Sequence, residues 1–545
     1  MQILILGISL LFLFVLCLYP FGTLIGKIIF GSENISLMDL FTNSSTLTAV
    51  LNTLIISLGT AFLSTIIALL LSWPLTRTDL PGKKILRSLF CLPYAIPPFI
   101  GAIAWIYLAN PQTGIINKLL GYSVLNIYSY TGLIWAMSGF FYTYILLSLL
   151  SALDRMDSSL EEAARLSGAG PLKVFFHISL PLVFPSFLSG ILLVILASAA
   201  SFGIPALIGN PARIYMITTK IFTLQKMGTM NGIYSGATLS LLLLGIAIIV
   251  LVINAVLLKK KFQVISGKTA RPSLISLGNY KWPLFIIICM MLFFLLFLPL
   301  LAIAISAFSK LQGDISLSNF TIDNFIRIFS EVEETPRALL NSLKLGFVAA
   351  SVATILGLFL SYLEQKTKIK GRSLISIIVA FPYATPGTVI ALALIITFSS
   401  NIMGIPISLY NTLTLIGLAY IAKYLNFAVR TTGDGLQQIH DCLHEAARIS
   451  GADWWTSIKT IWIPILTPSL VASFFLVFMP TFSELTMTIL LTGPGLETLG
   501  TLLFQLQEYS DISGGGAAVL ALFIVLVIAI INYTVKLISK GKYGL

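Results

Sequence analysis

Charged residues are scarce in this sequence. Asp, Glu, Lys and Arg make up only 10% of its 545 residues, against about 25% in an ordinary soluble domain. Histidine is also rare (3), which excludes a histidine-rich metal pathway. The four cysteines imply no disulfide framework, because three of them fall inside long apolar runs. Hydrophobic residues make up 57% and the mean hydropathy is +0.97, which is too much apolar surface for one core in water. The composition therefore excludes a water-soluble globular protein and predicts a lipid environment.

Long apolar runs recur along the whole chain, each about 20 residues, enough to cross roughly 30 Å of hydrocarbon. Lipid offers the backbone no hydrogen-bond partner, and the runs do not alternate as barrel strands do, so each run is predicted to be an α-helix. Twelve windows are predicted as spans: 3–25, 50–73, 88–108, 131–153, 181–204, 234–258, 283–306, 340–363, 375–398, 412–432, 464–492 and 515–538. We expect an all-α polytopic membrane protein of about twelve transmembrane helices.

The basic residues are unevenly placed. The 33 Lys and Arg exceed the 21 Asp and Glu, giving a formal charge of +12, which by itself could suggest a nucleic-acid partner. Most of the 33 fall in alternate segments between the windows, on the side that would also hold both termini. By the positive-inside rule this side is the cytoplasm. The charge is thus read as a topology signal: we expect a bacterial inner-membrane protein with both termini cytoplasmic and no nucleic-acid partner.

The chain contains an internal duplication. The segment Glu162–Ala169 matches Glu445–Ala452 at an offset of 283 with one Leu/Ile difference, and Pro93–Pro97 resembles Pro382–Pro386 at an offset of 289. Each copy contains six windows, an even number, so the two copies should enter the membrane in the same orientation. This predicts two parallel six-helix repeats. Their bounds are 1–258 for the first repeat, 259–282 for a cytoplasmic linker and 283–545 for the second repeat.

A short loop between the fourth and fifth windows is repeated with its spacing intact. Small alanines would let a partner approach one side of a helix, Gly168 would allow a turn, and Pro171 could begin a second short helix. The loop is thus predicted to form a helix–turn–helix knob on the cytoplasmic side. The repeated residues are Glu162, Ala163, Ala164 and Gly168 before Ile178–Pro181, and Glu445, Ala446, Ala447 and Gly451 before Ile461–Pro464.

These residues give the chain a close resemblance to the membrane permease subunit of binding-protein-dependent ABC importers, whose hallmark is this Glu-Ala-Ala…Gly loop. The resemblance implies that the loop containing Glu162 docks on one ATPase subunit and the loop containing Glu445 on the other. It also implies the partners: two copies of a cytoplasmic ABC ATPase, an external substrate-binding protein and the lipid bilayer. ATP and Mg would be used by those subunits, so we expect no cofactor on this chain and no enzymatic activity of its own.

The fusion of two six-span halves resembles the ferric-iron branch of this family, as do the segments Ala200–Gly209 and Glu484–Thr486. Ferric iron is therefore the expected substrate. Fused permeases for thiamine or 2-aminoethylphosphonate are near relatives and remain alternatives. An ion-coupled secondary transporter, which also commonly has twelve spans in parallel halves, is a further alternative.

Two ionisable residues fall at membrane depth, where charge is costly and is by default a hypothesis of function. Glu484 could offer oxygen to a hard cation, or it could pair with Lys423 or another helix to stabilise the bundle. The counterparts of these two residues at offset 283 are Ser201 and Phe140, which predicts a chemically asymmetric path. The candidate path residues are Glu484, Lys423, Asn426 and Ser201. No metal site is firmly predicted.

Overall fold

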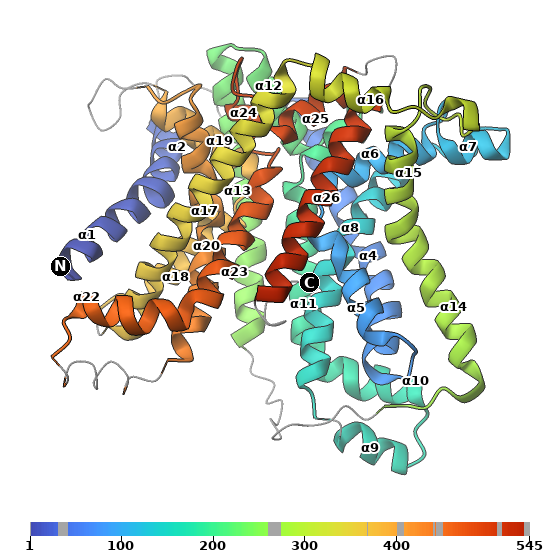
Figure 1. The fold of residues 1–545 in the computed structure, drawn as a ribbon, viewed down its shortest axis with the longest axis horizontal. Helices are drawn as coiled ribbons and strands as arrows, with labels where there is room; N and C mark the ends of the chain where they lie inside the picture. The colour runs from blue at the N-terminus through green and yellow to red at the C-terminus, as the bar shows by residue number, and fades with distance from the viewer. Residues whose placement is uncertain are drawn as a thin grey trace.

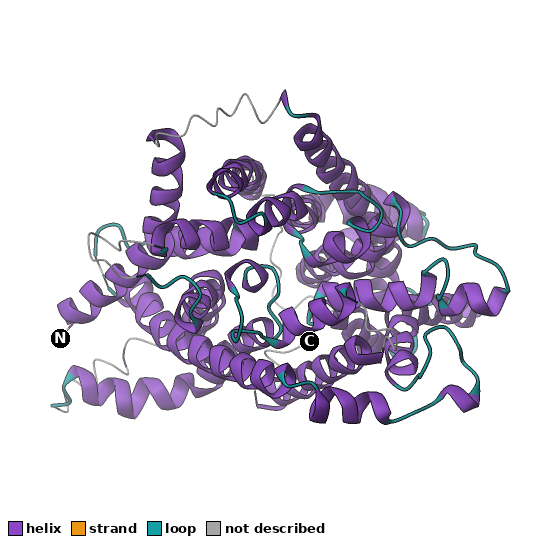
Figure 2. Cartoon of the chain, turned by 90° about the horizontal axis from the view of Figure 1, so that it is seen from above, coloured by secondary structure: helices purple, strands orange, loops and turns teal. Residues whose placement is uncertain are grey.

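The described part of the chain is helical. The computed structural model describes residues 2–30, 42–157, 159–259, 274–367, 369–399, 408–439, 442, 449, 451–509 and 515–538. Within these residues there is no strand, only two isolated β-bridges, and the helices pack lengthwise beside one another (Figures 1 and 2). The predicted all-α class is confirmed.

The helices of each repeat are in several places continuous through a π-helical turn, as in Ser9–Phe30 and Gly278–Ala307. In the first repeat they are α1 (Gln2–Leu13), α2 (Tyr19–Phe30), α4 (Ser44–Arg77), α5 (Lys83–Cys91), α6 (Pro98–Ala109), α7 (Ile115–Leu120), α8 (Tyr130–Arg155), α9 (Ser159–Leu166), α10 (Pro171–Val174), α11 (Leu180–Ala200), α12 (Ile217–Lys226) and α13 (Met230–Lys259). In the second they are α14 (Lys281–Leu292), α15 (Leu298–Ala307), α16 (Asp323–Ile326), α17 (Glu334–Lys366), α18 (Leu374–Ala384), α19 (Gly387–Phe398), α20 (Leu413–Gln437), α22 (Trp454–Ser457), α23 (Ile463–Phe482), α24 (Thr488–Leu491), α25 (Leu499–Glu508) and α26 (Gly515–Ile538).

Most predicted windows contain a helix that could cross a membrane. Among the described residues nine helices are long and apolar enough to do so, and two bent helix pairs raise the number to eleven. The remaining window, 412–432, corresponds to α20, which is 25 residues long but carries Lys423, Asn426 and Arg430. These polar residues lower the hydropathy of α20, and Asn426, which is buried, must find its partners inside the bundle.

Windows 88–108 and 375–398 are not straight spans, contrary to the sequence prediction. The chain bends by 97° between Lys83–Tyr94 and Pro98–Ala109, and by 102° between α18 and α19. Both bends fall at the repeated Pro-Tyr-Ala-x-Pro motif. The second proline of each motif, Pro97 or Pro386, has an extended ψ of 126° or 139°. Proline removes a backbone donor and disfavours helix in the residue before it, so each helix ends there and a new one begins.

Windows 181–204 and 464–492 also end earlier than predicted. Helix α11 ends at Ala200 and α23 at Phe482, and each is followed by a break in the helix, residues 201–202 and 483–487, before the next helical turn. The stretches 201–204 and 483–487, which begin at these breaks, occupy equivalent positions in the repeats.

The first span of each repeat packs on the other repeat. Phe21 of α2 meets Phe381 of α18 with ring centroids 4.7 Å apart, and the Thr23 and Thr397 hydroxyls are hydrogen-bonded. In the same way α15 packs against α6 and α26. In Figure 1, α1 and α2 lie at the left beside α19, and α14 and α15 lie at the right. The two halves are therefore interlocked rather than placed side by side.

The described part of the linker, residues 274–282, packs against the first repeat at the end of α4. Thr78 and Ile275 form a parallel bridge, and Asp79 accepts hydrogen bonds from the Leu277 N–H (3.0 Å) and the Lys281 ammonium (3.2 Å). The hydrogen bond from the Leu277 N–H lowers the pKa of Asp79 below its ordinary value, and the nearby Lys281 ammonium lowers it further. These contacts fix residues 274–282 against the end of α4. The predicted bounds of the repeats and the linker remain a prediction.

Candidate functional site

The first repeated loop forms the predicted helix–turn–helix. Asp157 accepts the Ser159 N–H (2.9 Å) at the start of α9, and Gly168 ends the helix with φ at +84°. The Gly168 N–H donates to Arg165 O (2.9 Å), and α10 then begins at Pro171. A positive φ is favourable for glycine and costly for a residue with a side chain. Gly168 is thus required for the sharp turn between the two short helices.

One face of α9 is presented outward. Glu162, Ala163 and Gly168 are exposed, Ala164 is half-buried, and the α9 hairpin lies at the lower edge of Figure 1. Leu166 in the same loop is 91% exposed. A large aliphatic side chain held almost wholly in water costs free energy unless a partner covers it. The face combines small residues with one apolar anchor, as a docking surface does.

The second loop is described only in part. Glu445, Ala446 and Ala447 lie outside the described residues. Gly451 has φ at +81°, close to the value at Gly168, so the turn glycine behaves alike in both repeats. Ile449, the counterpart of Leu166, is 87% exposed.

Leu166 and Ile449 are not among the site residues predicted from the sequence, although they are the one Leu/Ile difference between the two matched segments. The sequence spacing does indicate their role, because Leu166 lies three residues after Ala163 and four after Glu162 and so falls on the same helix face. An apolar residue at that spacing on an otherwise polar face indicates an interface.

The segments 201–204 and 483–487 meet where the halves join. A Cβ placed on Gly203 would lie 3.2 Å from Leu485 Cδ2 and 2.5 Å from Phe99 Cβ. Ser201 lies at the start of its segment, where its carbonyl accepts the Thr218 hydroxyl (2.7 Å). Glu484 occupies the equivalent position in the other half. The structure therefore brings the Ser201 and Glu484 segments close together across the boundary between repeats.

Glu484 is buried, with 7% of its surface exposed. One carboxylate oxygen accepts the Met487 N–H and the other accepts the Thr488 N–H, both at 2.9 Å, and the Thr488 hydroxyl adds a third hydrogen bond. The Thr488 hydroxyl is also hydrogen-bonded to Tyr420 of α20 (2.7 Å). Both oxygens already serve donors of this chain, which favours the stabilising alternative for Glu484 over a free cation ligand.

Lys423 lies at the break between α18 and α19. Its ammonium donates to Tyr383 O (2.9 Å) and to Thr385 O, two carbonyls left without helical partners at the end of α18. No ion pair joins it directly to Glu484 in the described part of the chain, although the two opposite charges interact through space. Asn426, one turn along α20, is buried with 6% exposed. Lys423 thus closes the break in the second repeat, where the first repeat has Phe140.

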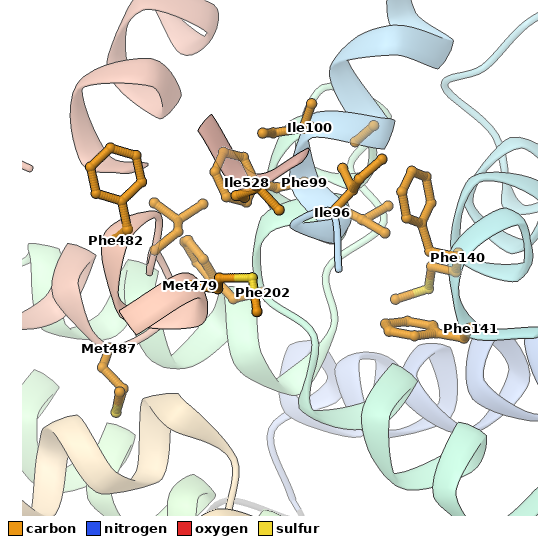
Figure 3. Close-up of a cluster of buried hydrophobic side chains, with 14 of the residues drawn as sticks. Ile96, Phe99, Ile100, Phe140, Phe141, Phe202, Met479, Phe482, Met487 and Ile528 are labelled. Atoms are coloured by element: carbon orange, nitrogen blue, oxygen red, sulfur yellow. The ribbon is translucent and has the colours of Figure 1, made fainter. Parts of the chain in front are cut away.

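The centre of the molecule is apolar. Side chains from several helices, among them Phe99, Phe202, Met479 and Phe482, belong to one buried cluster (Figure 3). At the upper end in Figure 1 the halves are joined by polar contacts: Lys226 Nζ donates to the Tyr509 hydroxyl at 3.0 Å. These two residues are counterparts at offset 283. The two halves are thus joined by an apolar cluster and, beyond it, by this polar contact.

No metal centre is evident in the described residues, because no group of three His, Cys, Asp or Glu side chains there is arranged to hold an ion. His440 and His444, which are four residues apart in the sequence and so form a conceivable metal site, lie outside that part of the chain.

Family comparison gives two matches along the chain. Residues 77–262 and again 353–542 match the family described as "Binding-protein-dependent transport system inner membrane component". The chain belongs to this family. The double match confirms the fused two-repeat permease, a multi-pass membrane protein of a family of transport permeases rather than enzymes. Each match includes the repeated Glu-Ala-Ala…Gly loop of its repeat.

Individual relatives carry different names. The Fe(3+)-transport system permease protein FbpB 2 of Haemophilus influenzae is 27% identical over 476 residues, covering 86% of this chain and 85% of that protein. A putative 2-aminoethylphosphonate transport system permease protein, PhnV of Salmonella paratyphi A, is 26% identical over 226 residues, covering 42% and 83%. A crystal structure of a bacterial ABC transporter involved in the import of the acidic polysaccharide alginate covers 48% of this chain and 98% of its own, with 19% identity and a TM-score of 0.40.

The role of Glu484 in this permease can be tested directly. Glu484→Gln replaces one acceptor oxygen by an amide that cannot accept, so at least one of the Met487 and Thr488 donors loses its buried partner, at a cost of about 1–3 kcal/mol. We expect a lower midpoint of thermal unfolding for the purified protein and no change in the substrate affinity of the molecules that remain folded. An unchanged midpoint with weakened substrate binding would instead identify a ligand. Glu508→Gln, at an exposed position at the end of α25, is the matched control.

Proposed function

We propose that this chain is the transmembrane permease of an ABC importer that moves ferric iron, delivered by an external binding protein, into the cytoplasm. Two cytoplasmic ATPase subunits would bind its two coupling loops and drive the change between outward- and inward-facing states. The end of the molecule that carries α9 is then cytoplasmic, together with both termini. The chain itself makes and breaks no covalent bond.

The observation that carries the proposal is the pair of exposed aliphatic residues in the repeated loops. Leu166 and Ile449 are 91% and 87% exposed at equivalent positions, each two residues before a positive-φ glycine. A duplicated apolar anchor is explained by a partner present in two copies. A secondary transporter or a channel gives no reason for the second anchor.

The coupling role predicts a specific result for the turn glycines. Gly168→Val together with Gly451→Val places a β-branched residue at positive φ in each loop, at a cost of roughly 1–2 kcal/mol per loop. We expect the wild-type chain to retain an ATPase subunit on purification and the double valine variant to lose it. The control is Gly168→Asn with Gly451→Asn, because asparagine adopts positive φ more readily, so retention should largely persist.

The rival classes give different outcomes. Equal ATPase retention by the valine variant and the wild type would contradict the coupling role of the loops. Uptake that continues without any ATPase but stops when the proton gradient is dissipated would favour an ion-coupled secondary transporter.

Support for ferric iron comes from the Haemophilus relative, named for Fe(3+) transport, which is similar across most of both chains. The putative 2-aminoethylphosphonate permease supports the second candidate, although it matches less than half of this chain. Uptake of labelled ferric iron, 2-aminoethylphosphonate and thiamine should be compared in a strain lacking this chain, with and without the gene restored. Restoration of iron uptake alone is expected. Unchanged iron uptake would reject iron and leave the permease assignment intact.

A further inference from the structure

The coupling helix α9 is attached to the membrane helices through a charged side chain. Glu161 is the buried residue of α9, while its neighbours Leu160 and Glu162 are exposed. The Glu161 carboxylate is 2.8 Å from Arg77 Nε, with 3% and 2% of the two side chains exposed. A short surface helix is usually fixed by an apolar face. Here the fixing contact is a buried ion pair.

The ion pair joins four elements. Arg77 ends α4, and its Nη2 donates to Leu153 O (3.0 Å) in the last turn of α8. Ser179, directly before α11, donates its hydroxyl to Glu161 Oε1 (2.5 Å). The Arg77 carbonyl also accepts the Ile275 N–H of the linker (2.8 Å). Glu161 of α9 is therefore bonded directly to residues at the ends of α4 and α11, and through Arg77 it is connected to the last turn of α8.

The geometry of these charged hydrogen bonds resists displacement of α9 relative to the membrane helices. A buried charge is tolerated only where its partners satisfy it in good geometry, and removing one partner leaves the other charge uncompensated. Hydrogen bonds to ionised groups are shorter and stronger than neutral ones, and the planar guanidinium holds its donors in a fixed fork. A displacement of α9 therefore pulls on Arg77 and Ser179 together, whereas an apolar contact would let the helix slide.

The second repeat has a histidine at the position that corresponds to Glu161. The counterparts of Arg77, Glu161 and Ser179 are Lys366, His444 and Trp462. Lys366 Nζ donates to Ile439 O (2.9 Å) at the end of α20, as Arg77 does at the end of α8. Trp462 instead packs on Tyr362, with ring centroids 5.2 Å apart. His444 lies outside the described residues, but its side chain at this position is not a carboxylate.

We propose that Arg77, Glu161 and Ser179 are positioning residues that transmit the movement of the first coupling loop to α4, α8 and α11. They form a charge-dependent joint in the first repeat, where the position of the carboxylate corresponds to His444 of the second repeat. The inference rests on the proposed function, because it requires an ATPase subunit on α9. It adds that docking of the ATPase and transmission of its movement depend on different residues: the exposed face of α9 docks, and Glu161 transmits.

The test separates docking from transmission. Arg77→Met with Glu161→Leu removes both charges and leaves no uncompensated ion, so the chain should accumulate normally. The variant is purified with the ATPase subunits that the wild type retains. Spin labels on Met227→Cys and Glu508→Cys, at exposed ends of α12 and α25, report movement at the outer end when ATP is added, in a chain that also carries Cys442→Ser. We expect ATPase retention within twofold of wild type, and at least a tenfold smaller fraction of molecules that change the label distance.

The matched control lies at the same end of the molecule. Arg87 and Asp154 form an exposed ion pair (2.5 Å, with 31% and 44% of the side chains exposed). Arg87→Met with Asp154→Leu should leave both retention and the ATP-dependent distance change at wild-type levels. The single variant Arg77→Lys keeps the charge but loses the fork of donors that reaches both Glu161 and Leu153 O, so it should retain only part of the distance change.

Each outcome has one meaning. A normal distance change in Arg77→Met with Glu161→Leu would overturn the inference, since the pair would then be a packing feature only. Loss of ATPase retention in that variant, with retention by the Arg87 control, would also overturn it by placing Glu161 in docking. If the wild type retains no ATPase, the proposed function itself fails, which this experiment records before any variant is compared.

Discussion

Replacing Leu166 and Ile449 by aspartate is expected to detach the ATPase subunits and abolish uptake. Each side chain is an almost fully exposed aliphatic anchor, and a buried carboxylate at the centre of an interface would be left without a partner. A loss of about 2 kcal/mol per loop weakens each contact by roughly 30-fold. Co-purification of the ATPase and substrate uptake in cells measure the effect.

Leu317→Asp is the control for this prediction. Leu317 is also 91% exposed but lies in the segment between α15 and α16, at the opposite end of the molecule from α9 (Figure 1). This variant should retain the ATPase fully. If the Leu166 and Ile449 variants retained the ATPase as well as Leu317→Asp does, the exposed anchors would not be the docking residues.

Lys423→Met is expected to produce the largest loss of stability among single substitutions of the path. The ammonium of Lys423 satisfies Tyr383 O and Thr385 O at the break between α18 and α19. Methionine has a similar volume and no donor, so both buried carbonyls lose their partner. Each unsatisfied carbonyl costs about 1–3 kcal/mol, and the release of a buried charge returns part of this. We expect a net loss of roughly 2–4 kcal/mol, measured by denaturation of the purified protein.

Lys459→Met is the comparison, because Lys459 is exposed near the start of α23 and its substitution should change stability little. Equal stability of the two methionine variants would show that the break does not depend on Lys423. A stable Lys423→Met protein that no longer transports would instead place Lys423 in the transport path.

The two halves share a fold but differ in the chemistry of equivalent positions. Lys423 closes the break in the second repeat where Phe140 stands in the first, and a Cβ on Gly101 would lie only 1.8 Å from the Phe140 ring. The two repeats therefore differ at the break between their bent helices: a lysine hydrogen-bonds to carbonyls there in the second repeat, and a phenylalanine packs there in the first. The coupling loops differ as well, because Glu161 of the first loop corresponds to His444 of the second.

The parts of the site that were predictable depend on local chemistry. A turn glycine, two small alanines and a proline at a helix start determine a helix–turn–helix from neighbouring residues alone, and α9, Gly168 and α10 agree with that prediction. The partners of Lys423 and Glu484 were left open between alternatives. Lys423 bonds to a residue 40 positions away, a contact that depends on how two helices cross and leaves no trace in either segment.

The amino-acid order by itself determined the lipid solvent, the helical class, the duplication and the position of both coupling loops, because each is expressed in composition or in residues close together in the chain. Only the tertiary structure decided that the prolines turn two spans through about a right angle, that each first span packs on the opposite repeat, and that Glu161 is buried against Arg77. The physical reason is that hydropathy records whether a segment avoids water, whereas its partner is chosen by packing between surfaces that are far apart in the chain.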